Sequence, residues 1–117
     1  MTLAQAHAQA GYCYLRIGEF AKARTELRSA LRSQDNECSR EGVLRNVLLA
    51  TTYLQQARPD LERILIYAHR ALESLSAHVD SARCRTHLTR LADDLQPYRR
   101  VPSVQEFLDR SRTLAAA

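Results

Sequence analysis

The sequence predicts an all-α protein of about six helices that pair as antiparallel hairpins. Only three glycines and three prolines interrupt the 117 residues, and 45% of the residues are hydrophobic, which favours long helices over disorder. Apolar residues recur every three or four positions along most of the chain. Small residues recur where two helices would have to approach closely. A chain of this length forms a single domain over 1–117 that can bury roughly two thirds of its unfolded surface.

Helix-end signals place the boundaries of these elements. Thr2 with Gln5, and Ser103 with Glu106, have the spacing of a capping box, in which each side chain bonds the other residue's backbone at a helix start. Gly18 supplies a tight break between the first two helices. The expected hairpins cover 3–33, 39–77 and 80–115. The expected helices cover 3–17, 19–33, 39–57, 60–77, 80–96 and 103–115.

The first hairpin carries the clearest spacing of small and aromatic residues. From Gly11 to Ala30 the chain reads G-x-x-Y-x-x-x-G-x-F-x-x-A-x-x-x-L-x-x-A. The second hairpin repeats the scheme about forty residues later, with RPDL in place of GEF in its turn. The third keeps only apolar stripes, so we expect it to be a degenerate cap with a polar outer face. The second set comprises Ala50, Tyr53, Ala57, Leu61, Ile64, Ala68 and Ala71.

The spacing over 11–30 resembles that of the tetratricopeptide repeat (TPR) family. Tyr14 and Tyr53 stand at the aromatic position of the first helix of a repeat, and Phe20 stands at that of the second. The sequence departs from the pattern at His7, where tryptophan is common, and at Asp35, where proline often ends a repeat. The resemblance implies a short right-handed α-solenoid that binds a protein or peptide on its concave face.

Two longer stretches are similar to the C-terminal helical repeats of actinobacterial helix-turn-helix transcriptional regulators. These are ATTYLQQARPDLERILIYAHRAL over 50–72 and SARCRTHLTRLADDLQPYRRVPSVQEFLDR over 81–110. The likeness implies a protein-binding or assembly module of an intracellular bacterial regulator. No DNA-reading helix-turn-helix is apparent, so DNA would be contacted only by a domain outside this chain.

The resemblance to TPR proteins, taken residue by residue, places a mixed set of side chains on the concave face. Amides and an aromatic lie toward one end, aliphatic side chains in the middle and a basic group toward the other end, which suits a peptide with apolar anchors. Alternatively, Val47 and Leu48 are core residues and the polar residues only face solvent. The expected contact residues are Gln5, Gln9, Tyr12, Arg16, Val47, Leu48, Thr51, Gln55, Thr86, Thr89, Arg90 and Asp93.

A second possible function is homodimerisation with no separate ligand. The outer side of the first helix is small and apolar, and a partner subunit would cover such a face. The aliphatic residues of the third helix offer another dimer surface. The residues on the outer side of the first helix are Leu3, Ala4, Ala6, Ala8 and Ala10.

A third possible function is direct nucleic-acid binding through an arginine stripe. Arg24, Arg28 and Arg32 follow i, i+4, i+8 spacing, and the net charge is +4. Such a stripe could meet phosphates or an acidic partner. Glu19 and Glu26 are interspersed, however, so a solvated helix face is the simpler interpretation.

Catalytic and cofactor motifs are not apparent in the sequence. It contains no phosphate-cradling glycine motif, nucleophile elbow or H-E-x-x-H motif, and we expect no enzyme activity and no cofactor. Cys84 and His87 share a helical face, and His69 and His78 lie on or just after the preceding expected helix, but the paired spacings of a zinc site are missing. We therefore expect no metal, and Cys84 to pack as a small hydrophobe.

The cysteines and the hydrophobic pattern indicate the compartment. Cys13, Cys38 and Cys84 are an odd number, form no C-x-x-C pair and follow no secretory segment, which predicts a reduced, cytoplasmic protein. The hydrophobic residues are periodic and do not form a long apolar run. We therefore expect no membrane association through a spanning helix.

Overall fold

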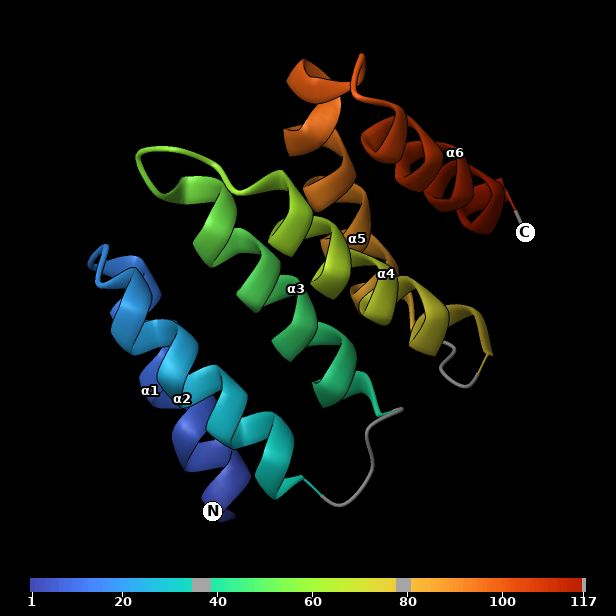
Figure 1. Ribbon diagram of the computed structural model, residues 1–117. Helices are drawn as coiled ribbons and strands as arrows, with labels where there is room; N and C mark the ends of the chain where they lie inside the picture. The colour runs from blue at the N-terminus through green and yellow to red at the C-terminus, as the bar shows by residue number, and fades with distance from the viewer. Residues whose placement is uncertain (35–38, 78–80, 117) are drawn as a thin grey trace.

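The computed structural model describes residues 1–34, 39–77 and 81–116, which form six α-helices and a short 3-10 helix (Figure 1). The predicted all-α class and helix ranges are confirmed, with each helix end within two residues of the expected one. Asp35, Cys38 and His78 lie outside the described residues. The elements are α1 Leu3–Arg16, α2 Phe20–Ser33, α3 Arg40–Gln55, α4 Leu61–Ala77, α5 Ala82–Leu95, η1 Gln96–Tyr98 and α6 Pro102–Ala116.

The start and end of α1 follow the predicted signals. The Thr2 hydroxyl accepts from the Gln5 backbone N–H at 3.0 Å, and the Gln5 side chain accepts from the Thr2 N–H at 2.8 Å. This capping box satisfies two backbone donors that the helix itself leaves free. Gly18 has φ +79°, a conformation that favours glycine, and it turns the chain from α1 into α2.

The second predicted capping box, at Ser103 and Glu106, is wrong. Helix α6 begins one residue earlier, at Pro102, so Ser103 lies inside the first turn and is not its N-cap. Proline suits the first helical position because its φ is already helical and the N–H it lacks would have no partner there. The Val101 carbonyl accepts the first helical bond, from the Gln105 N–H at 3.0 Å.

The helices form a flat assembly with extents of 38 × 33 × 18 Å. Helices α2, α3 and α4 lie side by side, with α1 packed on α2 and α5 packed on α3 and α4 (Figure 1). The pairs α1–α2 and α3–α4 pack closely. Helix α6 divides its contacts between α4 and α5. The pair α5–α6 is therefore looser than the pairs α1–α2 and α3–α4.

The main apolar core lies in α3–α6. Its largest fully buried side chains include Phe107, Ile64, Leu72, Leu88 and Leu95. Burying a side chain of this size stabilises the fold by about 1.5–3 kcal/mol. The buried side chains of the first hairpin form a separate, smaller set outside this cluster. They are Ala4, Leu15, Ala23, Leu27 and Ala30.

Polar contacts join the first hairpin to α3. Arg45 is only 5% exposed, and its Nη1 donates to Oε1 of Gln34, the C-cap of α2, at 2.7 Å. Burial lowers the pKa of the Arg45 guanidinium. Leu49 and Thr52 follow Arg45 on the same face of α3, and both are fully buried. This face therefore combines one aliphatic side chain with hydrogen-bonding groups.

Gly11 sets the close approach of α1 and α2. A Cβ at this position would lie 2.7 Å from Leu27 Cγ and 3.3 Å from the Ala23 carbonyl oxygen. Ala23, Leu27 and Ala30 are fully buried on the facing side of α2. The recurring small residues thus lie where the two helices of this hairpin touch.

The variant Gly11→Ala should lower the free energy of unfolding by about 1–3 kcal/mol, because the added methyl forces Leu27 or the helix to move. Urea denaturation followed by circular dichroism measures this. Gln9→Ala, at an exposed position of the same helix, serves as the control and should change stability by less than about 0.5 kcal/mol. Helix propensity alone would make Gly11→Ala more stable by about 1 kcal/mol, so a gain in stability would contradict the close packing.

Candidate functional site

The predicted contact residues lie on three neighbouring helices, because α3 packs against both α1 and α5. Those on α1 and α5, together with Gln55, are exposed, whereas Leu48 and Thr51 are half-buried. Val47 is 5% exposed and belongs to the main core, as the alternative interpretation held, so it does not contribute to an exposed face. The residues are Gln5, Gln9, Tyr12 and Arg16 on α1, Val47, Leu48, Thr51 and Gln55 on α3, and Thr86, Thr89, Arg90 and Asp93 on α5.

Several of the polar side chains in this set already have local partners. The Gln5 side chain belongs to the capping box of α1. The Thr51 hydroxyl donates to the Val47 carbonyl at 2.8 Å, and the Thr86 hydroxyl donates to the Ala82 carbonyl at 2.9 Å. These groups are less available to a partner than the aromatic and charged residues are.

Tyr12 and Arg16 form the most distinctive pair on this face. Tyr12 is 48% exposed, and the Arg16 guanidinium carbon lies 5.8 Å from the centroid of its ring. Gln9 precedes Tyr12 by three residues and Arg16 follows it by four, so the three side chains share one side of α1. An exposed tyrosine beside an arginine is typical of residues that contribute strongly to protein interfaces.

The predicted apolar side of α1 is only partly exposed. Leu3 and Ala6 are exposed, whereas Ala4 is buried and Ala8 and Ala10 are half-buried. Leu3 and Ile17 are exposed, at 66% and 72%, but they lie at opposite ends of the helix, roughly 21 Å apart along its axis. The exposed aliphatic side chains are therefore confined to Leu3 and Ala6 at the start of α1 and to Ile17 at its end, and they do not form one patch along the helix.

Arg24 contacts α3 and does not lie on a solvated helix face. Its Nε donates to the Thr52 hydroxyl at 3.0 Å, and its Nη2 donates to the Thr52 carbonyl at 3.0 Å and to Gln56 Oε1. Its guanidinium carbon lies 3.9 Å from the centroid of the Tyr53 ring, which is the distance of direct stacking. The interpretation of this residue as part of a solvated stripe is wrong.

Arg28 lies one helical turn further along α2 and contacts two tyrosines. Its Nη2 donates to the Tyr53 hydroxyl, and its Nε donates to the Tyr67 hydroxyl at 3.4 Å. The two tyrosine rings are nearly parallel, at 7°, with centroids 6.1 Å apart. Arg32, by contrast, is exposed and donates to Ser29 within the same helix. Two of the three arginines of the stripe therefore lie between the hairpins.

Helix α4 adds two more arginines to this group. The Arg63 guanidinium carbon lies 5.8 Å from the Tyr53 ring centroid, and that of Arg70 lies 5.4 Å from the Tyr67 ring centroid. We call the set Arg24, Arg28, Arg63, Arg70, Tyr53 and Tyr67 the arginine–tyrosine cluster. Sequence reasoning missed it, although Arg63, Tyr67 and Arg70 follow i, i+4, i+7 spacing on one helical face.

The cluster brings positive charges close together. Burial lowers the pKa of Arg24, Tyr53 opposes this effect, and the charges of Arg28 and Arg63 lower the pKa further. The hydrogen bond with Tyr67 raises the pKa of Arg28 and outweighs the effect of its burial. Both guanidinium groups remain charged at neutral pH, because arginine loses its proton only far above it.

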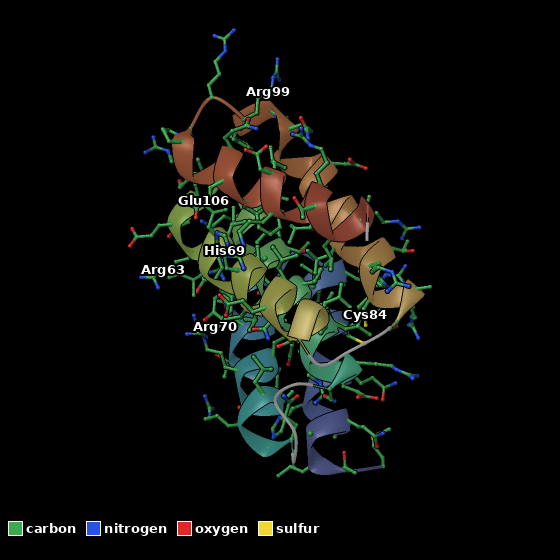
Figure 2. All side chains as sticks on the ribbon, turned by 90° about the vertical axis from the view of Figure 1, so that its right-hand side faces the viewer. Arg63, His69, Arg70, Cys84, Arg99 and Glu106 are labelled. Atoms are coloured by element: carbon green, nitrogen blue, oxygen red, sulfur yellow. The ribbon has the colours of Figure 1, made fainter. Side chains whose placement is uncertain are left out.

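His69 links α4 to α6 beside the cluster. Its Nδ1 accepts a hydrogen bond from Arg110 Nη1 at 2.7 Å, which requires the neutral ring, and its ring meets Phe107 edge to face at 5.4 Å. Burial lowers the pKa of His69 and the Arg110 charge lowers it further, whereas Glu106 and Glu73 oppose the shift. Figure 2 shows His69 and Glu106 on the same side of the molecule as Arg63 and Arg70.

Cys84 packs as the sequence predicts. It is 1% exposed, belongs to the main core, and its Sγ donates to the Arg40 carbonyl at 3.7 Å. His87, on the next turn, is half-buried. Within residues 1–34, 39–77 and 81–116, no three histidine, cysteine or acidic side chains converge in a way that could hold a metal ion.

Comparison with known proteins identifies no relatives: family models, curated proteins and solved structures all lack a match to this chain. None of the helices in the described parts of the chain is long and apolar enough to cross a membrane.

Lowering the pH from 7 to 5 should destabilise the protein partly through His69. The pKa of His69 in the folded state lies below the unfolded value of about 6.5, so protonation of His69 favours the unfolded state. The contribution of neutral His69 to the free energy of unfolding is therefore complete above about pH 6.5 and falls as the pH drops below that value. In His69→Gln, which cannot titrate, the difference between the free energies of unfolding at pH 7 and pH 5 should be smaller than in the wild type. Urea denaturation at both pH values measures this difference, and an identical difference in the variant would refute the assignment.

Proposed function

We propose that this chain is a protein- or peptide-binding module of the TPR type, a short right-handed solenoid whose last hairpin is a cap. The partner lies along the exposed faces of α1, α3 and α5. The observation that carries the proposal is Tyr12, a large aromatic side chain 48% exposed in the middle of a helix, with the Arg16 guanidinium over its ring. Such pairs serve as anchors in protein interfaces because they bury much area at a low entropic cost.

The packing of the helices supports this proposal. Helix α3 contacts both α1 and α5, so the first helices of successive hairpins are neighbours, as they are in stacked repeats. Stacked hairpins bind through an extended surface built from corresponding faces of successive helices. On α5 this surface offers Thr89, Arg90 and Asp93, all exposed, which can orient a polar or charged part of the partner.

The likeness of 50–72 and 81–110 to bacterial regulators suggests the setting of this binding. We infer that the module assembles an intracellular bacterial transcriptional regulator or senses a peptide for it, and that DNA is contacted by a domain outside this chain. Homodimerisation through the outer side of α1, where Leu3 and Ala6 are exposed, or through the aliphatic residues of α3 is the alternative. The burial of Ala4 and the partial burial of Ala8 and Ala10 leave little of that side of α1 open to a second copy, which favours a separate partner.

Peptides selected from a phage-displayed library on the wild-type protein should lose about tenfold or more in affinity for Tyr12→Ala and Arg90→Ala, because each removes an anchor from the binding face. Isothermal titration calorimetry measures the affinities. Arg32→Ala removes an exposed arginine outside this face and should change them by less than about twofold.

Unchanged affinity in both Tyr12→Ala and Arg90→Ala would show that the binding face is assigned wrongly. Light scattering of the wild type over a range of concentrations tests the alternative. A monomer leaves the face free for a partner, whereas a concentration-independent dimer would make self-assembly the main role and replace this proposal.

A further inference from the structure

We propose that the arginine–tyrosine cluster is a second interaction surface, and that it binds an acidic segment of a protein partner through the carboxylates of aspartate and glutamate. The cluster is formed by residues of α2, of the C-terminal end of α3, and of α4. It is separate from the Tyr12 face and does not depend on the function proposed above.

The first argument is the excess of positive charge. Arg24 and Arg28 have only neutral hydrogen-bond partners among the described residues, namely Thr52, Gln56 and the hydroxyls of the two tyrosines. Arg63 forms an ion pair with Asp60 at 3.2 Å, while Arg70 stacks on Tyr67. Four guanidinium groups thus surround two aromatic rings and are only partly neutralised, which creates a positive potential at the surface.

The second argument is that the two central arginines are held in place with donors to spare. Each uses Nε and Nη2 in the hydrogen bonds within the protein, and within the described part of the chain Nη1 makes none. An Nη1 group carries two N–H donors. Because Arg24 and Arg28 are half-buried and fixed by α3 and α4, binding to them costs little side-chain entropy.

The third argument is the access provided by α4. The Arg63 side chain is 56% exposed and Arg70 is also exposed. Figure 2 shows both on the same side of the molecule. These two arginines can therefore turn toward a bound segment, while Arg24 and Arg28 supply fixed charges beneath it.

The chemistry favours carboxylates over a nucleic-acid backbone. A guanidinium group pairs with a planar carboxylate through two parallel hydrogen bonds. Asp60, which pairs with Arg63 at 3.2 Å, and the exposed Glu62 lie on or beside α4 next to the cluster, and they would repel a long phosphate backbone with closely spaced charges. A short acidic peptide brings fewer charges past them, and its carboxylates can pair with Arg24, Arg28 and Arg70 while Asp60 stays paired with Arg63.

An octaglutamate peptide labelled with fluorescein is a suitable probe, and fluorescence anisotropy measures its binding. The wild type should bind it saturably, and the double variant Arg63→Gln/Arg70→Gln should bind it about tenfold more weakly. The control Arg99→Gln/Arg100→Gln removes the same charge from two exposed arginines at the far end of the molecule, where Figure 2 places Arg99. It should weaken binding by less than about twofold.

Equal weakening in the two double variants would overturn the proposal, because it would reduce the effect to net charge. The proposal would also be overturned if the wild type showed no saturable binding up to about 1 mM peptide. It would be overturned as well if the wild type bound a duplex DNA of equal charge more tightly than it binds the peptide. Tyr12→Ala should bind the acidic peptide like the wild type. The two proposed surfaces can therefore fail independently.

Discussion

The stacking of the Arg24 guanidinium on Tyr53, together with its hydrogen bonds to Thr52 and Gln56, is the contact on which the arrangement of the hairpins depends. The main apolar cluster draws its residues from α3–α6, so it does not itself hold α1 and α2 in place. A hydrogen bond from a charged donor contributes about 1.5–3 kcal/mol, and a partly desolvated cation–π contact contributes about 1–2 kcal/mol. A few such contacts can therefore decide whether the first hairpin stays docked.

The molecule therefore has two parts that are stabilised by different interactions. The body of α3–α6 is held by aliphatic and aromatic packing. The first hairpin is held within itself by the packing of Leu27 against Gly11, and to the body by Arg24, Arg28 and Arg45 together with the buried Leu49 on the same face of α3. Both proposed surfaces involve the first hairpin: Tyr12 lies on α1, and the cluster includes two arginines of α2. Binding at either surface therefore depends on the docking of this hairpin.

Local patterns predicted the helices well, because apolar periodicity, the Thr2 capping box and Gly18 act within a few residues of the chain. The start of α6 differed from the prediction. Ser103 was expected to cap the helix, but Pro102 already occupies its first helical position. The role of Arg24 and Arg28 could not be predicted in this way. Their partners lie 25 to 39 residues away on α3 and α4, so only the packing of the hairpins brings them together.

Native-state amide hydrogen exchange on the variant Arg24→Met tests the central claim most directly, because methionine keeps the aliphatic stem but removes the charge and the hydrogen bonds. Protection in α1 and α2 should fall by about 10- to 100-fold relative to the wild type, while protection in α4–α6 stays within about twofold. The control Arg32→Met replaces an exposed arginine of the same helix and should leave the protection of both regions unchanged. Unchanged protection in α1 and α2, or an equal loss in all helices, would contradict the account.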